Sequence, residues 1–167
     1  MMETSTPQSD ASIRLLDRAG HVLNDQPERV REDTDVPPNE DKTALISATL
    51  PDLSNVGAVQ LVLSGHVVDS ITVPATPPSA PAVQVSRSGA TLAVRWNQPR
   101  AEGGRTTYDV QVSHDAGRTW KTVAVGLSST SATLTPEQLG PGAPSQVRVI
   151  ANDGFNTSPP GLASISP

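Results

Sequence analysis

The 167-residue chain contains no cysteine, which excludes disulfide bonds, thiol catalysis and cysteine-bound metals. Aromatic residues are nearly as scarce, because the sequence holds only two Trp, one Tyr and one Phe. These residues, Trp96, Tyr108, Trp120 and Phe155, all lie in the C-terminal half of the chain. Any core formed before residue 80 must therefore be aliphatic.

Long apolar runs and basic clusters are missing as well. No window of about 18 apolar residues could span a membrane, and the start MMETSTPQSD lacks the basic and apolar regions of a signal peptide. The formal net charge of -5 argues against nucleic-acid binding, because phosphate contacts need a basic face. We therefore expect no membrane span and no nucleic-acid partner.

Proline and glycine, by contrast, are abundant, with 16 and 12 copies. Proline interrupts helix interiors and central strands alike, so its spread along the chain confines regular structure to short segments. No stretch shows a helical repeat of apolar residues beyond about two turns. The composition therefore predicts an all-β fold, which we expect to comprise two small β-sandwich-like modules.

A proline-rich stretch marks the expected domain boundary. Four of the eight residues from Pro74 to Pro81 are proline, which favours an extended, semi-rigid linker at 74–81. We expect residues 1–11 to be a tail, either disordered or foreign to the natural protein. Residues 12–73 are then a small antiparallel β domain, and residues 82–167 form a second module.

The first module reads as two hairpins around a long loop. Ser12–Leu16 and Val22–Leu23 flank one glycine turn, and residues 58–63 and 67–73 flank another. Alternation of apolar residues also favours a strand from Ala44 to Leu50. Residues 24–42 carry seven Asp or Glu, three basic residues and no apolar periodicity, which predicts a long acidic loop. Calcium binding by this loop stays open, although its acids lack the alternating Asp-x-Asp-x-Asp-Gly pattern.

The second module shows seven short strand candidates separated by turn signals, the pattern of an immunoglobulin-like β-sandwich. They are Val83–Ser86, Thr91–Trp96, Tyr108–Ser113, Trp120–Val125, Ser131–Leu134, Val147–Asn152 and Leu162–Ile165. The period of two assigns one side of each central strand to the core. That set is Leu92, Val94, Trp96, Tyr108, Val110, Val112, Val147, Val149 and Ala151.

Several of these strings resemble a fibronectin type III domain over residues 80–167. They are Trp96-Asn-Gln-Pro, Tyr108-Asp-Val-Gln-Val, and Leu139-Gly-Pro-Gly followed by Val147-Arg-Val-Ile-Ala. The resemblance implies that Trp96 packs under Tyr108 and that the Leu139 turn enters the sixth strand. Where the family has a tyrosine that ties this corner to the backbone, the chain has Ser145, which implies a weaker corner.

The octapeptide SHDAGRTW, residues 113–120, resembles the Asp-box of sialidases. In that family the motif repeats around a propeller, away from the catalytic centre, whereas this chain has one copy and too few strands for a propeller. Local turn chemistry explains it better. Asp115 can accept backbone N–H bonds, Gly117 can take a left-handed conformation, and Trp120 can begin the return strand.

Other candidate sites have weaker signals. His21, His66 and His114 fall in expected turns without the paired spacing of zinc ligands, so we expect no metal and no cofactor. No catalytic triad or nucleophile elbow is visible. Phe155 follows the sixth strand, in a loop where an aromatic could contact a partner, but we expect its side chain to be buried beneath the loop.

We interpret the chain as non-catalytic. Fibronectin type III modules in bacteria serve as spacers and docking units, and the N-terminal half faintly resembles the region after the catalytic domain of secreted bacterial zinc metallopeptidases. These resemblances imply an extracellular or cell-surface accessory region of a larger hydrolase, monomeric, with any catalytic domain outside this chain. Its partners would be the rest of the parent polypeptide and a protein or polysaccharide ligand. The alternative is an adhesion or carbohydrate-binding module acting through the sandwich loops, although such modules commonly expose more aromatics.

Overall fold

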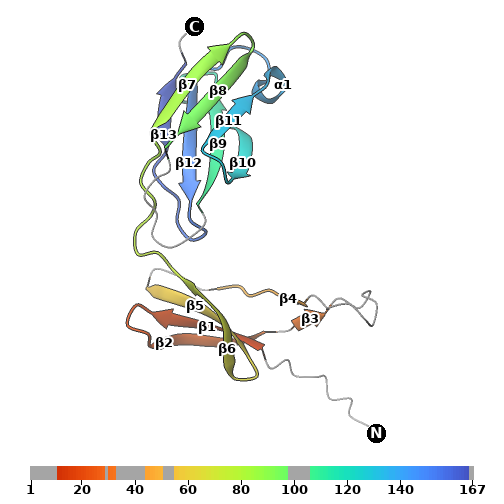
Figure 1. The fold of residues 1–167 in the computed structure, drawn as a ribbon, viewed down its shortest axis with the longest axis vertical. Coiled ribbons are helices and arrows are strands. Elements are labelled where there is room, and N and C mark those ends of the chain that lie inside the picture. Colours follow the sequence, from red (N-terminus) through yellow and green to blue (C-terminus); the bar gives the residue numbers. More distant parts are fainter. Residues whose placement is uncertain (1–10, 29, 33–43, 51–54, 98–105, 166–167) are drawn as a thin grey trace. The chain divides into compact units, whose positions relative to one another are not determined.

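The computed structural model describes residues 11–28, 30–32, 44–50, 55–97 and 106–165. The chain divides into two compact units, Met1–Val73 (unit 1) and Pro74–Pro167 (unit 2). Every sheet in the described part is antiparallel (Figure 1). The predicted all-β fold class is confirmed.

Unit 1 is built on a four-stranded sheet with the order β2-β1-β5-β6. Its strands are β1 (Ala11–Asp17), β2 (Val22–Glu28), β5 (Val56–Leu63) and β6 (His66–Thr72). A separate two-stranded ribbon pairs β3 (Val30–Glu32) with β4 (Ala44–Ile46). The buried side chains are aliphatic, as the absence of aromatics requires: Ala11, Leu15, Val56, Val62 and Val73.

Two expected boundaries in unit 1 were wrong. The tail was expected to reach residue 11, but Ala11 is the first residue of β1 and is 2% exposed. The acidic loop was expected to start at residue 24, but β2 continues to Glu28 and β3 follows. Strand β2 lies at the edge of the sheet, where a strand needs no apolar periodicity and tolerates a proline such as Pro27. The ion pair between Asp25 of β2 and Arg14 of β1, at 2.8 Å, also holds β2 against the sheet. Residues 29 and 33–42 of the expected loop lie outside the described residues.

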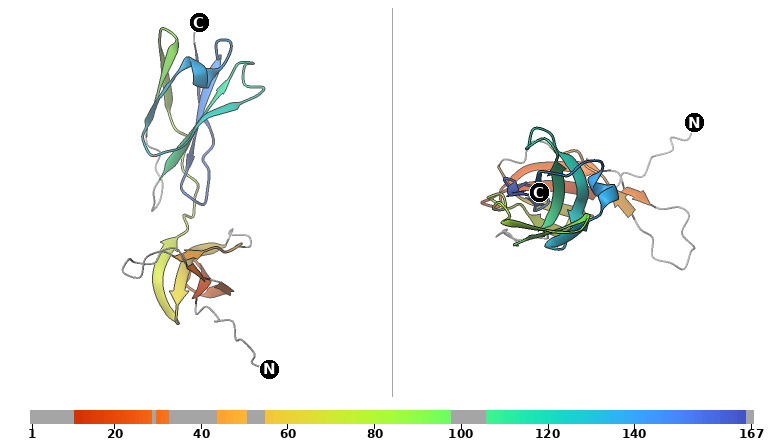
Figure 2. Two further views of the ribbon diagram at one scale, coloured as in Figure 1. Left: turned by 90° about the vertical axis from the view of Figure 1, so that its right-hand side faces the viewer. Right: turned by 90° about the horizontal axis from the view of Figure 1, so that it is seen from above.

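The described residues of unit 2 form seven strands in two sheets, which lie face to face (Figures 1 and 2). The three-stranded sheet has the order β11-β8-β7, and the four-stranded sheet has the order β10-β9-β12-β13. The strands are β7 (Val83–Ser88), β8 (Thr91–Trp96), β9 (Thr107–Ser113), β10 (Lys121–Leu127), β11 (Ser131–Leu134), β12 (Gln146–Asn152) and β13 (Gly161–Ser164). A one-turn helix, α1 (Pro136–Leu139), precedes β12 where only a turn was expected.

The core of unit 2 lies between these sheets and follows the alternation of the strands. Its buried members are Leu92, Val94, Trp96, Tyr108, Val110, Val112, Leu134, Leu139, Val147, Val149 and Ala151. The rings of Trp96 and Tyr108 meet edge-to-face with centroids 5.4 Å apart. Burial raises the pKa of the Tyr108 phenol.

The proline-rich stretch is more closely packed than a free linker would be. Pro78 is fully buried and Pro81 is buried as well. The Asn156 side chain donates a hydrogen bond to the Pro74 carbonyl at 3.4 Å, and Gly161 of β13 lies against the Pro81 carbonyl. Proline has almost no side-chain entropy to lose on burial, so its packing carries only a small entropic cost. Residues 74–81 therefore belong to unit 2.

Three edge strands are irregular or capped. Strand β10 shifts register twice against β9, and the Asp109 carboxylate of β9 accepts the Gly126 N–H at 2.9 Å. Strand β6 shifts register against β5, and the Asp69 carboxylate accepts the Ser70 N–H at 2.8 Å. Strand β2 contains Pro27. Each of these features removes backbone N–H or C=O groups from the regular row that another strand could pair with.

Candidate functional site

The hairpin between β9 and β10 is organised by the side chains of Ser113, Asp115 and Thr119. One Asp115 carboxylate oxygen, Oδ1, accepts the Thr119 N–H and the Ser113 hydroxyl, each at 2.8 Å. The other, Oδ2, accepts the Thr119 hydroxyl at 2.6 Å. Ser113 is buried, and its Oγ also accepts the Gly117 N–H at 2.8 Å. The Asp-box-like motif is thus a hydrogen-bonded turn.

These hydrogen bonds favour the charged form of Asp115. The Thr119 hydroxyl, the Thr119 N–H and the Ser113 hydroxyl, in that order, hold the pKa of Asp115 well below its ordinary value of 3.8. A group with a lowered pKa in the folded state stabilises that state fully above its unfolded-state pKa. The contribution is lost as the pH falls through the folded-state pKa.

We expect the stability advantage of the wild-type chain over an Asp115→Asn variant to be constant above about pH 5 and to shrink below about pH 4. Asparagine cannot gain the charge that the three donors stabilise. Thermal unfolding followed by tryptophan fluorescence would measure this, because Trp96 and Trp120 both lie in unit 2. A difference that stays constant from pH 7 to pH 2 would contradict the assignment.

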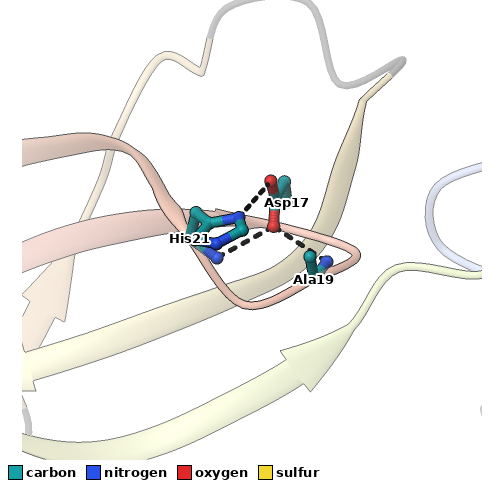
Figure 3. Close-up of polar contacts among 3 residues, drawn as sticks. All are labelled: Asp17, Ala19 and His21. Atoms are coloured by element: carbon teal, nitrogen blue, oxygen red, sulfur yellow. Dashed lines mark hydrogen bonds and ion pairs between the residues drawn. The ribbon is translucent and has the colours of Figure 1, made fainter.

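Unit 1 contains a turn of the same kind (Figure 3). Oδ1 of Asp17 accepts the N–H groups of Ala19 and His21, both at 2.8 Å, while Oδ2 lies 3.0 Å from Nδ1 of His21. The His21 N–H is the main cause that lowers the pKa of Asp17. In both hairpins the carboxylate thus contacts the backbone and the side chain of the residue four positions later.

The Asp115 turn fixes the position of Trp120. The indole Nε1–H donates to the Gly117 carbonyl at 3.1 Å. Gly117 has a φ of +88°, and a Cβ there would approach the Gln146 side chain to 2.7 Å, so glycine lets Trp120 and Gln146 lie close to the turn. The half-buried indole packs beneath the Arg148 guanidinium, whose carbon lies 4.3 Å from the ring centroid.

Arg148 belongs to a row of side chains that crosses the outer face of the four-stranded sheet. Thr122, Gln111, Arg148 and Leu162 are register partners on β10, β9, β12 and β13. The Arg148 Nε–H donates to Gln111 at 2.6 Å, and the Gln111 amide donates to Thr122 at 2.9 Å. The two terminal amino groups of Arg148 have no hydrogen-bond partner among the described residues. We call Trp120, Arg148, Gln111, Thr122 and Leu162 the tryptophan-arginine face.

The remaining predicted site residues lie elsewhere. Trp96, Tyr108, Val110, Val112, Val147, Val149 and Leu139 are buried in the core. Phe155 is half-buried in a loop whose N–H groups at Phe155 and Asn156 donate to the Asp153 carboxylate at 2.9 and 2.7 Å. Ser145 supports the Asp115 turn, because its hydroxyl donates to the Ser113 carbonyl at 3.1 Å and accepts the Ala116 N–H at 3.2 Å.

Sequence reasoning missed Arg148, Gln111 and the role of Ser113. Alternation along β9 and β12 placed Gln111 and Arg148 on the outward side of the sheet. It carried no signal that Trp120, which lies just before β10 rather than at its start as expected, would cover the guanidinium. The motif identified the turn, but the contact it creates depends on residues far apart in the sequence.

The two sheet orders correspond to strands E-B-A and C′-C-F-G of an immunoglobulin-like sandwich. The core pairs a tryptophan of strand B with a tyrosine of strand C, as the sequence resemblance implied. Unit 2 has a fibronectin type III fold. The predicted resemblance over residues 80–167 is confirmed at the level of the fold.

Comparisons with known proteins give structural neighbours only. No family model and no curated protein matches the chain. A two-domain fibronectin type III segment from chicken tenascin is 19% identical, covering 98% of this chain and 88% of that one, with a TM-score of 0.43. A Fn3-like protein from Clostridium thermocellum is 22% identical over 57% of this chain and 100% of that one, with a TM-score of 0.36. The fold assignment rests on the strand order of unit 2.

Within the described residues, no three His, Cys, Asp or Glu side chains gather as metal ligands would. No helix in the same part of the chain is long and apolar enough to cross a membrane. A shallow hollow of about 250 Å³ lies beside α1, lined mainly by apolar residues that include Leu92, Pro136 and Leu139.

Proposed function

We propose that the chain is a non-catalytic accessory region that docks onto another polypeptide through the tryptophan-arginine face of its fibronectin type III unit. The observation that carries this proposal is the stacked pair of Trp120 and Arg148, 4.3 Å apart, on the outer face of a sheet. Tryptophan and arginine are, with tyrosine, the residues enriched among the energetic centres of protein interfaces. Gly117 accepts a hydrogen bond from Trp120, and Gln111 accepts one from Arg148. Because both side chains are already fixed, docking would cost little further side-chain entropy.

The same proposal extends to the parent protein. The resemblances of the sequence favour a larger secreted bacterial hydrolase, a metallopeptidase in particular, with its catalytic domain outside this chain. The chain would then act outside the cell or at its surface, as a monomeric part of that protein. Many cell-surface domains share this sandwich architecture, which supports the location.

A photo-crosslinking residue at Leu162 should capture the docking partner in the native host. Leu162 is 59% exposed and is the register partner of Arg148. The matched control is the same crosslinker at Thr133, which is exposed on the other sheet of the unit. We expect one polypeptide joined at Leu162 and none at Thr133. Equal crosslinking from both positions would contradict docking through this face.

The isolated chain is also expected to show no hydrolysis of casein or aryl glycosides. A blank result supports the non-catalytic part of the proposal. Reproducible turnover that a point substitution abolishes would overturn it.

The alternative, an adhesion or carbohydrate-binding module, has less support in the geometry. Sugar rings stack on exposed aromatic faces, but one face of Trp120 is covered by the Arg148 guanidinium. Phe155, the aromatic of the sandwich loops, is half-buried. Binding of the chain to a glycan array that is lost on Phe155→Ala would favour this alternative.

A further inference from the structure

We infer that the tryptophan-arginine face recognises the carboxylate groups of an acidic segment in its partner polypeptide. This inference rests on the proposed docking function and adds the chemistry of the partner. It follows from the hydrogen bonding and stacking of the Arg148 guanidinium, from the charged residues around it and from the difference in net charge between the two units.

The guanidinium of Arg148 is prepared for a planar anion. Its Nε–H is engaged by Gln111 at 2.6 Å, and one of its faces lies against the Trp120 indole. Rotation of the group is therefore restricted from two sides. The terminal amino groups, which have no hydrogen-bond partner in the described parts of the chain, form a fork whose geometry matches the two oxygens of a carboxylate. A carboxylate would thus meet donors that are already oriented.

The acidic residues near this face do not compete for the fork. The Asp109 carboxylate, on the same strand as Gln111, accepts the Gly126 N–H at 2.9 Å. Asp115 is engaged by Thr119 and Ser113 within its turn. Arg118, in the same turn, is exposed and adds positive charge. Among the described residues, the terminal amino groups of Arg148 therefore remain open to a carboxylate from a partner.

The distribution of charge between the units supports an acidic partner. Unit 1 contains twelve Asp or Glu and five Arg or Lys, a net charge of -7, whereas unit 2 contains five and seven, a net charge of +2. The basic unit is the one that carries the tryptophan-arginine face. Complementary charge raises the association rate and selects among partners. The exposed Leu162 beside Arg148 can receive the methylene groups of glutamate, which makes glutamate a suitable ligand side chain.

A peptide titration of the full ¹⁵N-labelled chain tests the inference. The probe is hexaglutamate, and hexaglutamine serves as the uncharged control peptide. We expect hexaglutamate to shift the indole N–H resonance of Trp120 and leave that of the buried Trp96 in place, with no effect of hexaglutamine. Arg148→Gln should abolish the shift. Arg148→Lys, which keeps the charge but not the fork, should weaken binding at least about tenfold.

Arg95→Gln is the matched control, because it removes the same charge from an exposed position on β8 of the other sheet. It should bind hexaglutamate as the wild type does. The melting temperature and the Thr119 amide resonance of each variant establish that the Asp115 turn is intact. If Arg148→Gln disturbs the turn, Arg148→Lys supplies the comparison.

Several results would overturn the inference. They are equal shifts with both peptides, equal losses in Arg95→Gln and Arg148→Lys, or no shift with hexaglutamate at millimolar concentration. Sedimentation showing a wild-type dimer that Arg148→Lys dissociates would replace the acidic partner with a second copy of this chain. If hexaglutamate does not bind but the Leu162 crosslink forms, docking through this face is supported and the recognition of carboxylates is wrong. If neither is observed, the docking function and the recognition of carboxylates are both wrong.

Discussion

Replacing Trp96 with alanine is expected to lower the free energy of unfolding of unit 2 by about 3–5 kcal/mol, the usual cost of deleting a buried aromatic side chain. Trp96 is 5% exposed and its ring meets that of Tyr108 edge-to-face. The change would remove apolar burial and the contact between the rings, and it would leave a cavity between the sheets. Urea denaturation followed by circular dichroism would measure the loss.

The control for this variant is His114→Ala in the exposed tip of the β9–β10 hairpin. Its effect should stay within about 0.5 kcal/mol, as for most surface substitutions. Comparable losses from the two variants would mean that Trp96 does not anchor the core. A loss below about 1 kcal/mol for Trp96→Ala would lead to the same conclusion.

Substituting alanine for Gly161 is expected to destabilise unit 2 by about 1–3 kcal/mol, the range for overpacking a closely fitted site. A Cβ at this position would fall on the Pro81 carbonyl oxygen and would also approach the Val83 side chain to 2.9 Å. Backbone atoms cannot rotate aside as a side chain can. Strand β13 or the proline-rich stretch must therefore move.

Leu162→Ala is the neighbouring control, since Leu162 is 59% exposed and its truncation should change stability by less than about 0.5 kcal/mol. Thermal unfolding of both variants makes the comparison. Wild-type stability of Gly161→Ala would show that residues 74–81 do not pack on the sandwich in solution. The result thus distinguishes a packed proline-rich stretch from the extended, semi-rigid linker that the sequence favoured.

Unit 2 was the more predictable half of the chain because its strands alternate strictly. Val110 and Val149 face the core while Gln111 and Arg148 face outward, and a period of two is enough to assign these sides. The strand boundaries lie within two residues of those expected. The helix α1 was missed because its single turn, Pro136–Leu139, is too short to show a helical period.

Unit 1 was less predictable for physical reasons. Its β2 is an edge strand whose residues are mostly exposed, so no apolar pattern separates a strand from a loop there. Ala44–Ile46 pairs with β3, which lies in a segment that was expected to be a loop. Pairing between distant segments is decided by contacts that no local pattern records.

The candidate site was also predictable only where it depends on local sequence. Asp115 and Gly117 could be assigned to a turn from their chemistry alone, because an Asx-type turn and a left-handed glycine are local features. The stacking of Trp120 on Arg148 could not, since it requires the pairing of β9 with both β10 and β12. The resemblance to an Asp-box therefore predicted the turn that supports the tryptophan-arginine face. It did not predict the face itself.

The irregular edges of β2, β6 and β10 limit how copies of this chain can associate through their sheets. A regular edge would let two sheets join into a continuous, fibril-forming stack. Here the register shifts, Pro27 and the acceptors at Asp69 and Asp109 interrupt the donor rows that such growth would need. The exposed Val67, Val68 and Ile71 of β6 can then remain in water without seeding aggregation.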